Sequence, residues 1–300
     1  MSVDAPIPYI DRIRTYYQAL GYGAPYVWAH FTDVPFRRLT KPLSACRVAL
    51  VTTAAPYQPD KGDQGPGAPY NASAKFYQVY AGETAGEPDL RISHLSIDRD
   101  HTTASDQNSY FPLLALRRAV AAGRVGHLAD QYFGLPTNRS QRRTIEVDCL
   151  ELVSLCAAEG ADAAILVPNC PVCHQSVSLA ARALEEAGIA TVIMGCARDI
   201  VEHVGVARLV FSDFPLGNGA GRPHDVDSQD VTLSLALDLL ERAEAPRTTV
   251  QSPLRWSEDA AWKVDYSNID RLSPAEMARR RAEFDQGKSI ASQLRTHGSA

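Results

Sequence analysis

Short apolar runs alternate with amphipathic segments through the second half of the chain. Uninterrupted apolar runs predict strands over residues 163–167, 190–194 and 208–211. Apolar residues that recur at helical spacing predict helices over residues 144–159, 174–187, 198–204 and 228–242. Strands that alternate with helices in this order are typical of a parallel sheet with helices on both faces.

The first half of the chain gives a weaker pattern. Strands are predicted over residues 47–53 and 90–95, and helices over residues 8–20 and 111–122. Residues 57–70 are rich in glycine, proline and charge, and therefore predict a surface loop. We expect an α/β fold with a mostly parallel sheet in Rossmann-like or flavodoxin-like layers.

The distribution of these elements divides the chain into three parts. We expect an N-terminal arm over residues 1–45, an α/β core over residues 46–245 and a C-terminal tail over residues 246–300. Arm and tail carry aromatic residues without a clear period, so we expect them to pack on the core or on an oligomer mate. The pattern leaves open whether the core forms two lobes, 46–140 and 141–245.

Composition and charge narrow the class of protein. The formal net charge is −5, and the most basic run, at residues 278–281, lies in a predicted helix with acidic neighbours, so no nucleic-acid partner is expected. No apolar stretch reaches the roughly 18 residues that a membrane helix needs. The N-terminus lacks the apolar segment of a secretory signal. A cytoplasmic protein with reduced cysteines is the expectation.

The sequence Cys170-Pro-Val-Cys173-His174 carries the most specific chemistry in the chain. This Cys-x-x-Cys-His motif fits a dithiol redox centre, part of a zinc site or a haem attachment sequence. It joins the strand predicted over residues 163–167 to a helix, and parallel sheets bind their ligands at such strand ends. Unpaired backbone N–H groups and the helix dipole favour a thiolate there. We therefore expect Cys170 to be an activated thiolate.

This position helps to separate the three chemistries. Haem attachment requires an extracytoplasmic chain and is disfavoured. Structural zinc usually has four ligands, and a set of Cys170, Cys173, His174 and Cys196 remains an alternative. Two cysteines that only pack in the core are the plainest alternative. A redox or nucleophilic dithiol without a bound cofactor is favoured, with His174 as a neighbour that tunes it or donates a proton.

Other polar residues follow further predicted strand ends or lie in loops. They are candidates for substrate binding, proton transfer or metal binding: His94, His101, Asp106, Asn108, Asp63 and Asn218. Capping of a helix explains Asp106 and Asn108 equally well. A Gly-Asn-Gly turn explains Asn218 without a function.

Several segments between about residues 46 and 221 resemble one family. In chain order they are VALVTTAA with Gly62-Asp63-Gln64, ISHLSIDRDHTTASDQNSYFP, CPVC, GIATVIMG and FPLGN. Together they resemble the component B subunits of glycine, sarcosine and betaine reductases and, more closely, the small subunit of D-proline reductase. Those proteins carry a selenocysteine-x-x-cysteine motif after a strand, and Cys170 stands at the selenocysteine position.

The resemblance implies reductive cleavage of a substrate amine. In that family the amine is held as an iminium on a pyruvoyl group of a partner subunit. Carried over, Cys170 attacks the α-carbon and Cys173 releases the product as a disulfide forms, which an external, thioredoxin-like dithiol then reduces. A thiol is a poorer nucleophile and leaving group than a selenol, so a slower or different reaction is expected. The chain has no convincing self-cleavage site for its own pyruvoyl group.

The resulting hypothesis is a dithiol-dependent reductase that acts on a small amine or amino-acid derivative. We expect it to work as a homo-oligomer together with a partner subunit. Two alternatives remain open. One is a zinc-binding or non-catalytic scaffold subunit, and the other is a thiol-based lyase or racemase-like enzyme that uses Cys170 as a general base.

Overall fold

The computed structural model describes residues 5–92 and 94–297, and it confirms the predicted α/β fold. Its central sheet has eight strands in the described part of the chain, in the order β10-β9-β8-β7-β1-β6-β3, with β5 also paired to β1. The strands are β1 (Arg47–Thr52), β3 (Tyr80–Glu83), β5 (His127–Leu128), β6 (Gln131–Gly134), β7 (Ala163–Val167), β8 (Ala190–Gly195), β9 (Arg208–Phe211) and β10 (Thr248–Gln251).

The sheet is parallel except at one edge, where β3 pairs antiparallel with β6. The centre is formed by β1 and β7, which pair over five residues from Val48↔Ala163 to Thr52↔Val167. Strands of both halves of the core thus share one sheet. The strand predicted over residues 90–95 is shorter: β4 (Leu90–Arg91) pairs with β2 (Ala55–Pro56) in a separate two-stranded sheet. Ser93, within that prediction, lies outside the described residues.

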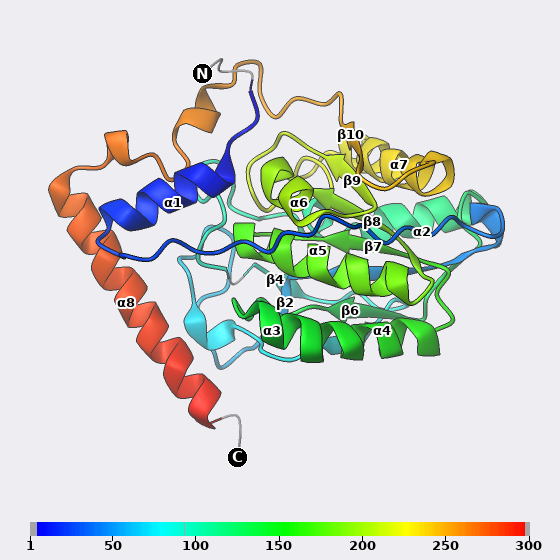
Figure 1. Cartoon of the computed structure of the whole chain (residues 1–300), viewed down its shortest axis with the longest axis horizontal. Coiled ribbons are helices and arrows are strands. Elements are labelled where there is room, and N and C mark those ends of the chain that lie inside the picture. The colour runs from blue at the N-terminus through cyan, green and yellow to red at the C-terminus, as the bar shows by residue number, and fades with distance from the viewer. Residues whose placement is uncertain (1–4, 93, 298–300) are drawn as a thin grey trace.

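Helices cover both faces of the sheet (Figure 1). The apolar side chains of α2 and α7 pack on one face, and those of α4, α5 and α6 pack on the other. Successive strand residues alternate between these two cores because their side chains point to opposite faces. The helices are α1 (Tyr9–Ala19), α2 (Leu113–Ala121), α3 (Gln141–Arg143), α4 (Cys149–Ala158), α5 (Pro171–Glu186), α6 (Arg198–Val204), α7 (Val226–Arg242) and α8 (Pro274–His297), with a π-helical turn over Thr144–Asp148 and short 3₁₀ turns over Leu43–Ala45, Ala72–Ala74, Gln107–Ser109, Ala261–Val264 and Ile269–Arg271.

The order of the strands reverses between β1 and β7. From β1 the chain passes through α2 to β6 on one side, and from β7 it passes through α5 to β8 on the other. In open parallel sheets, such a reversal leaves a crevice at the carboxyl ends of the two strands, and ligands bind there. The Cys170 motif directly follows β7, so the topology places it at this crevice.

The N-terminal arm and the C-terminal tail pack together on the core. Ile7, Tyr9 and Ile13 of the arm share an apolar cluster with Trp262 and Tyr266 of the tail. Figure 1 shows the arm running as extended chain across α5, while α8 runs past α1 at one end of the molecule. None of the described helices has the length and apolar character needed to cross a membrane.

Candidate active site at the end of β7

Cys170 begins helix α5 as its N-cap residue. Its backbone is extended, and its Sγ accepts a hydrogen bond from the backbone N–H of Cys173 at 3.3 Å. Pro171 occupies the first turn, where a missing N–H costs nothing. The helix therefore begins three residues earlier than residue 174, where the pattern predicted it. The cap fixes the Cys170 sulfur over the first turn of α5, on the same side as Cys173.

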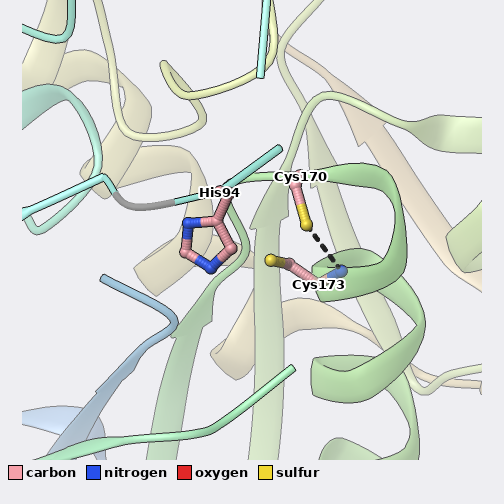
Figure 2. Close-up of side chains that lie close together, drawn as sticks. All are labelled: His94, Cys170 and Cys173. Atoms are coloured by element: carbon pink, nitrogen blue, oxygen red, sulfur yellow. Dashed lines mark hydrogen bonds between the residues drawn. The ribbon is translucent and has the colours of Figure 1, made fainter. Parts of the chain in front are cut away.

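Three side chains converge at this point (Figure 2). The sulfurs of Cys170 and Cys173 and a ring nitrogen of His94 all lie within 4.8 Å of one another, and all three residues are buried. Thr137, three residues beyond β6, adds a hydroxyl whose Oγ1 lies 3.1 Å from the Cys173 Sγ. The site thus combines α5, the loop after β4 and the loop after β6 at the carboxyl edge of the sheet.

The two thiols differ in their electrostatic environment. Burial raises the pKa of Cys170 well above its ordinary value, and the adjacent Cys173 sulfur raises it further. Burial opposes ionisation of Cys173 too, but the Cys170 thiol, His94 and the Thr137 hydroxyl together hold the pKa of Cys173 well below its ordinary value. Of the two thiols, Cys173 therefore has the lower pKa. This differs from the expectation that Cys170 is the resting thiolate.

His174 has a structural environment. Its Nδ1 donates to the Cys170 carbonyl at 2.8 Å, and its Nε2 accepts from the backbone N–H groups of Cys196 at 2.9 Å and Ala197 at 3.1 Å. Burial lowers the pKa of His174 to about 4, so the ring is neutral near pH 7. Both ring nitrogens are thus engaged by backbone groups, and the ring joins the first turn of α5 to the loop after β8.

His101 lies between two carboxylates. Its Nδ1 lies 2.9 Å from Asp98 Oδ1, and its Nε2 lies 3.1 Å from Asp265 Oδ2 in the tail. The ring therefore connects the loop that follows His94 to the C-terminal tail. It does not line the cavity at the thiols.

Asp106 and Asn108 serve a capping role in the structure. Asp106 Oδ1 accepts from the backbone N–H of Asn108 at 3.0 Å, which caps the 3₁₀ turn Gln107–Ser109. Its Oδ2 accepts from the backbone N–H of His224 and the side chain of Gln229, each at 2.7 Å. These bonds hold the pKa of Asp106 below its ordinary value although burial opposes them.

Two further candidates also bond to nearby groups of the chain. Asp63 is exposed and accepts from the backbone N–H of Gly65 at 2.9 Å, within its own loop. Asn218 is buried, donates to the Pro215 carbonyl at 3.0 Å and accepts from Thr102 Oγ1 at 3.3 Å. Neither residue lines the cavity at Cys170.

The expected set of zinc ligands is not the set that the structure assembles. Among the described residues, the potential metal ligands that converge are His94, Cys170 and Cys173, and neither His174 nor Cys196 is among them. His174 is held by backbone groups, and Cys196 lies in the apolar cluster of arm and tail, where burial raises its pKa to about 12. His94 replaces both in any metal site built on this motif.

A cavity of about 830 Å³ opens above the thiols. Cys170 and His94 line it, whereas Cys173 lies behind them. Side chains of the arm, of α1 and of α8 form its opposite wall, and Thr137 and Arg139 line it from the loop after β6. Sequence reasoning missed Thr137 and Arg139. The apolar run Tyr132–Leu135, followed by polar residues, was the available signal for a strand end at this position.

Comparison with known proteins identifies two relatives. D-proline reductase subunit gamma of Acetoanaerobium sticklandii is 28% identical over 220 residues, which cover 73% of this chain and 88% of that protein. Glycine reductase complex component B subunit gamma of Carboxydothermus hydrogenoformans is 28% identical over 227 residues, 73% of this chain and 49% of that protein. The chain thus spans about half the length of the second relative. No family model and no solved structure matches the chain.

Proposed function

The chain is related to the gamma subunits of D-proline reductase and of glycine reductase component B, as its motifs indicated, and from this premise we propose that it is a dithiol-dependent reductase. The observation that carries the proposal is the convergence of two buried sulfurs and one imidazole at a cavity that Cys170 and His94 line. The substrate is an amine or amino-acid derivative, a small molecule rather than a peptide, whose C–N bond is cleaved. Both relatives are named as subunits, which supports a partner subunit for this chain as well.

The reaction balances with two thiols as the reductant. A substrate C–N bond and two S–H groups give a C–H bond, an N–H bond and one disulfide. In the first step the Cys173 thiolate takes the Cys170 proton, the Cys170 sulfur bonds to the carbon as the C–N bond breaks, and that proton passes on to the leaving nitrogen. In the second step Cys173 attacks the Cys170 sulfur, the S–C bond breaks and the carbon receives a proton. An external dithiol reduces the disulfide again by thiol–disulfide exchange.

The environment of each sulfur supports this division of roles. Cys170 lines the cavity, so its sulfur can reach a substrate atom, whereas Cys173 lies behind it. Cys173 is the sulfur with the lowered pKa, and a thiolate is the species that attacks a neighbouring sulfur. His94 is within reach of both sulfurs and lines the cavity, so it can hold the Cys173 proton and pass it to the carbon. An activating pyruvoyl group would come from the partner subunit.

A redox titration of the full-length protein tests the dithiol. In buffers of graded reduced and oxidised glutathione, we expect two thiols to be lost together, and peptide mapping to show a Cys170–Cys173 disulfide. Cys170→Ser and Cys173→Ser should each abolish the transition. Cys46→Ser is the control, because the Cys46 Sγ already donates to the Lys41 and Pro42 carbonyls and a serine hydroxyl can do the same. Absence of the disulfide in the wild type would contradict the proposal.

A zinc centre is the second candidate, favoured by the same three side chains. Two thiols and one imidazole are ligands that zinc prefers, and three protein ligands with an open position are typical of catalytic zinc. Here the open position would face the cavity. Metal analysis after dialysis separates the candidates. One tightly bound zinc per chain, lost in His94→Ala, would replace the reductase with a zinc protein, whereas a metal-free protein that forms the disulfide supports the reductase.

A further inference from the structure

The two ends of the chain contribute many aromatic side chains to the lining of this cavity, beside the charged residues Arg14, Arg279, Arg280, Glu283 and Lys288. The aromatic side chains include Tyr17 of α1, Tyr26 and Trp28 of the arm, Tyr266 of the tail and Phe284 of α8. With about 830 Å³, the cavity lies within the roughly 300–1,000 Å³ of pockets that take drug-sized ligands. A site for a compound of only a few atoms needs much less room. The size and the lining therefore fit a ligand with a bulky apolar body.

The arm is fixed over the cavity by helix α5 itself. Gln175 follows directly after the Cys170 motif, and its side chain is buried. Its Oε1 accepts from the Ala29 backbone N–H, and its Nε2 donates to the Tyr26 hydroxyl, each at 2.7 Å. The arm segment that carries Tyr26 and Trp28 is thus anchored to the same helix that carries the thiols, so the space between them is a built feature of the site.

Arg139 places a positive charge in this cavity. Its guanidinium lies 5.6 Å from the centre of the Phe284 ring and, among the described residues, makes no hydrogen bond or ion pair. The other four arginines of the lining are engaged. Arg14 pairs with Asp11, Arg279 and Arg280 pair with Glu276, and Arg99 donates to backbone carbonyls, among them that of His94. The charge of Arg139 is therefore available to an anionic ligand.

The backbone of Arg139 supports a specific role for this residue. Its φ of 55° lies in the left-handed region, a backbone conformation that residues other than Gly, Asn and Asp seldom adopt. Two residues earlier, Thr137 contacts the Cys173 sulfur, so one loop positions both groups. Unusual backbone conformations of this kind cluster at functional sites.

We propose that the ligand of this cavity is a carboxylate-bearing compound with a bulky apolar or aromatic body, and that Arg139 binds its carboxylate. The identity of this ligand as a substrate rests on the proposed reductase function. Under that function, the substrate is an amino-acid derivative with a large side chain or a large N-substituent. A guanidinium binds a carboxylate through two parallel N–H···O bonds. The aromatic side chains of the lining contact the apolar body, while Cys170 lines the same cavity.

Calorimetric titration of the reduced, full-length protein tests this proposal with three probes. The first is 3-phenylpropionate. The second is propionate, which lacks the ring, and the third is phenethylamine, which carries an ammonium group in place of the carboxylate. We expect 3-phenylpropionate to bind at least tenfold more tightly than either of the others. Equal affinity for propionate and 3-phenylpropionate would overturn the proposal that the ligand has a bulky apolar body. Equal affinity for phenethylamine and 3-phenylpropionate would overturn the proposal that it carries a carboxylate.

Variants of Arg139 complete the test. Arg139→Asn removes the charge and suits the left-handed backbone, so the loop should fold, and the affinity for 3-phenylpropionate should fall about tenfold. Arg139→Lys should restore part of it. Arg142→Gln is the matched control, because Arg142 is exposed and lies outside the cavity. Equal affinities of Arg139→Asn and Arg142→Gln would overturn the assignment. Binding needs no redox step, so a failed glutathione titration with intact probe binding rejects only the reductase.

Discussion

The Thr137 hydroxyl lies 3.1 Å from the Cys173 sulfur, and it reaches that sulfur from the opposite side of the strand reversal. Thr137 follows β6, which pairs with β1, whereas Cys173 belongs to the helix that follows β7. A hydroxyl can donate to a thiolate, and charge-assisted hydrogen bonds are stronger than neutral ones. The pairing of strands in the sheet thus places a hydroxyl at the sulfur whose pKa is lowered.

Thr137→Val should therefore raise the pKa of Cys173. A hydrogen bond to a charged group contributes about 1.5–3 kcal/mol, which corresponds to a rise of about one to two pKa units. The thiolate can be followed by its ultraviolet absorbance during a pH titration of the reduced protein. Thr137→Ser keeps the hydroxyl and should titrate as the wild type does. If valine and serine give the same curve, the hydroxyl does not stabilise the thiolate.

Cys173→Ser separates reduction from the lyase and racemase alternatives. A reductase that lacks its resolving sulfur should stop after one turnover, with the substrate-derived group on Cys170, because the S–C bond is no longer displaced by a second thiol. Mass spectrometry of the intact protein after incubation with substrate and partner would detect this adduct. Undiminished multiple turnover would instead indicate a reaction that needs Cys170 alone, such as general-base catalysis.

His174 makes the stability of the fold depend on pH. Its pKa is lowered by burial to about 4, whereas an unfolded histidine titrates near pH 6.5. Between these values the unfolded state binds more protons than the folded state. The contribution of His174 to the free energy of unfolding is therefore fully present above about pH 6.5 and is lost as the pH drops toward 4. The total loss is about 3 kcal/mol.

Urea unfolding at pH 7 and at pH 5 measures this effect. The wild type should lose roughly 2 kcal/mol more than His174→Gln between the two pH values, because the glutamine does not titrate. His127→Gln, at an exposed histidine, should behave as the wild type does. If wild type and His174→Gln lose the same amount, His174 is not held neutral in the folded protein.

The sequence pattern predicted the elements with buried, regular periodicity. Strands β7, β8 and β9 read as uninterrupted apolar runs because both faces of these strands are covered by helices. The pattern did not predict β3, β5, β6 or β10. β3 and β10 are edge strands with exposed or half-buried positions, β5 has two residues, and β6 has four with a short apolar run, so none of the four gives a long one. Tertiary pairing, and not local periodicity, determines these strands.

The sequence predicted only those parts of the candidate site that local structure determines. The strand–helix junction is local, so Cys170 and Cys173 could be placed from the sequence. His94 was predicted as a residue at the end of a sheet strand, yet its loop follows the two-stranded sheet of β2 and β4. His174 is adjacent to Cys173 in sequence, but consecutive helical residues diverge by about 100°, which directs its ring toward the loop after β8. Thr137 depended on the unpredicted β6.

His101→Phe should weaken the attachment of the tail and destabilise the fold. The change removes the partner of Asp98 Oδ1, and Asp98 Oδ2 already has no hydrogen-bond partner among the described residues. Asp98 is buried, and a buried charge that loses its side-chain partner is costly, so we expect a loss of about 2–3 kcal/mol at pH 8. Limited proteolysis should cut the tail faster, because Asp265 loses its bond to the ring.

The pH dependence of the His101→Phe variant identifies Asp98 as the cause. Burial raises the pKa of Asp98, and His101 partly offsets this rise, so without the ring the pKa should rise further. The folded state then binds a proton more readily than the unfolded state, and the destabilisation should shrink as the pH falls from 8 to 5. Adding Asp98→Asn to His101→Phe removes the charge and should restore much of the stability at pH 8. A double variant as unstable as the single one, at both pH values, would mean that lost packing of the ring against Trp262 causes the effect.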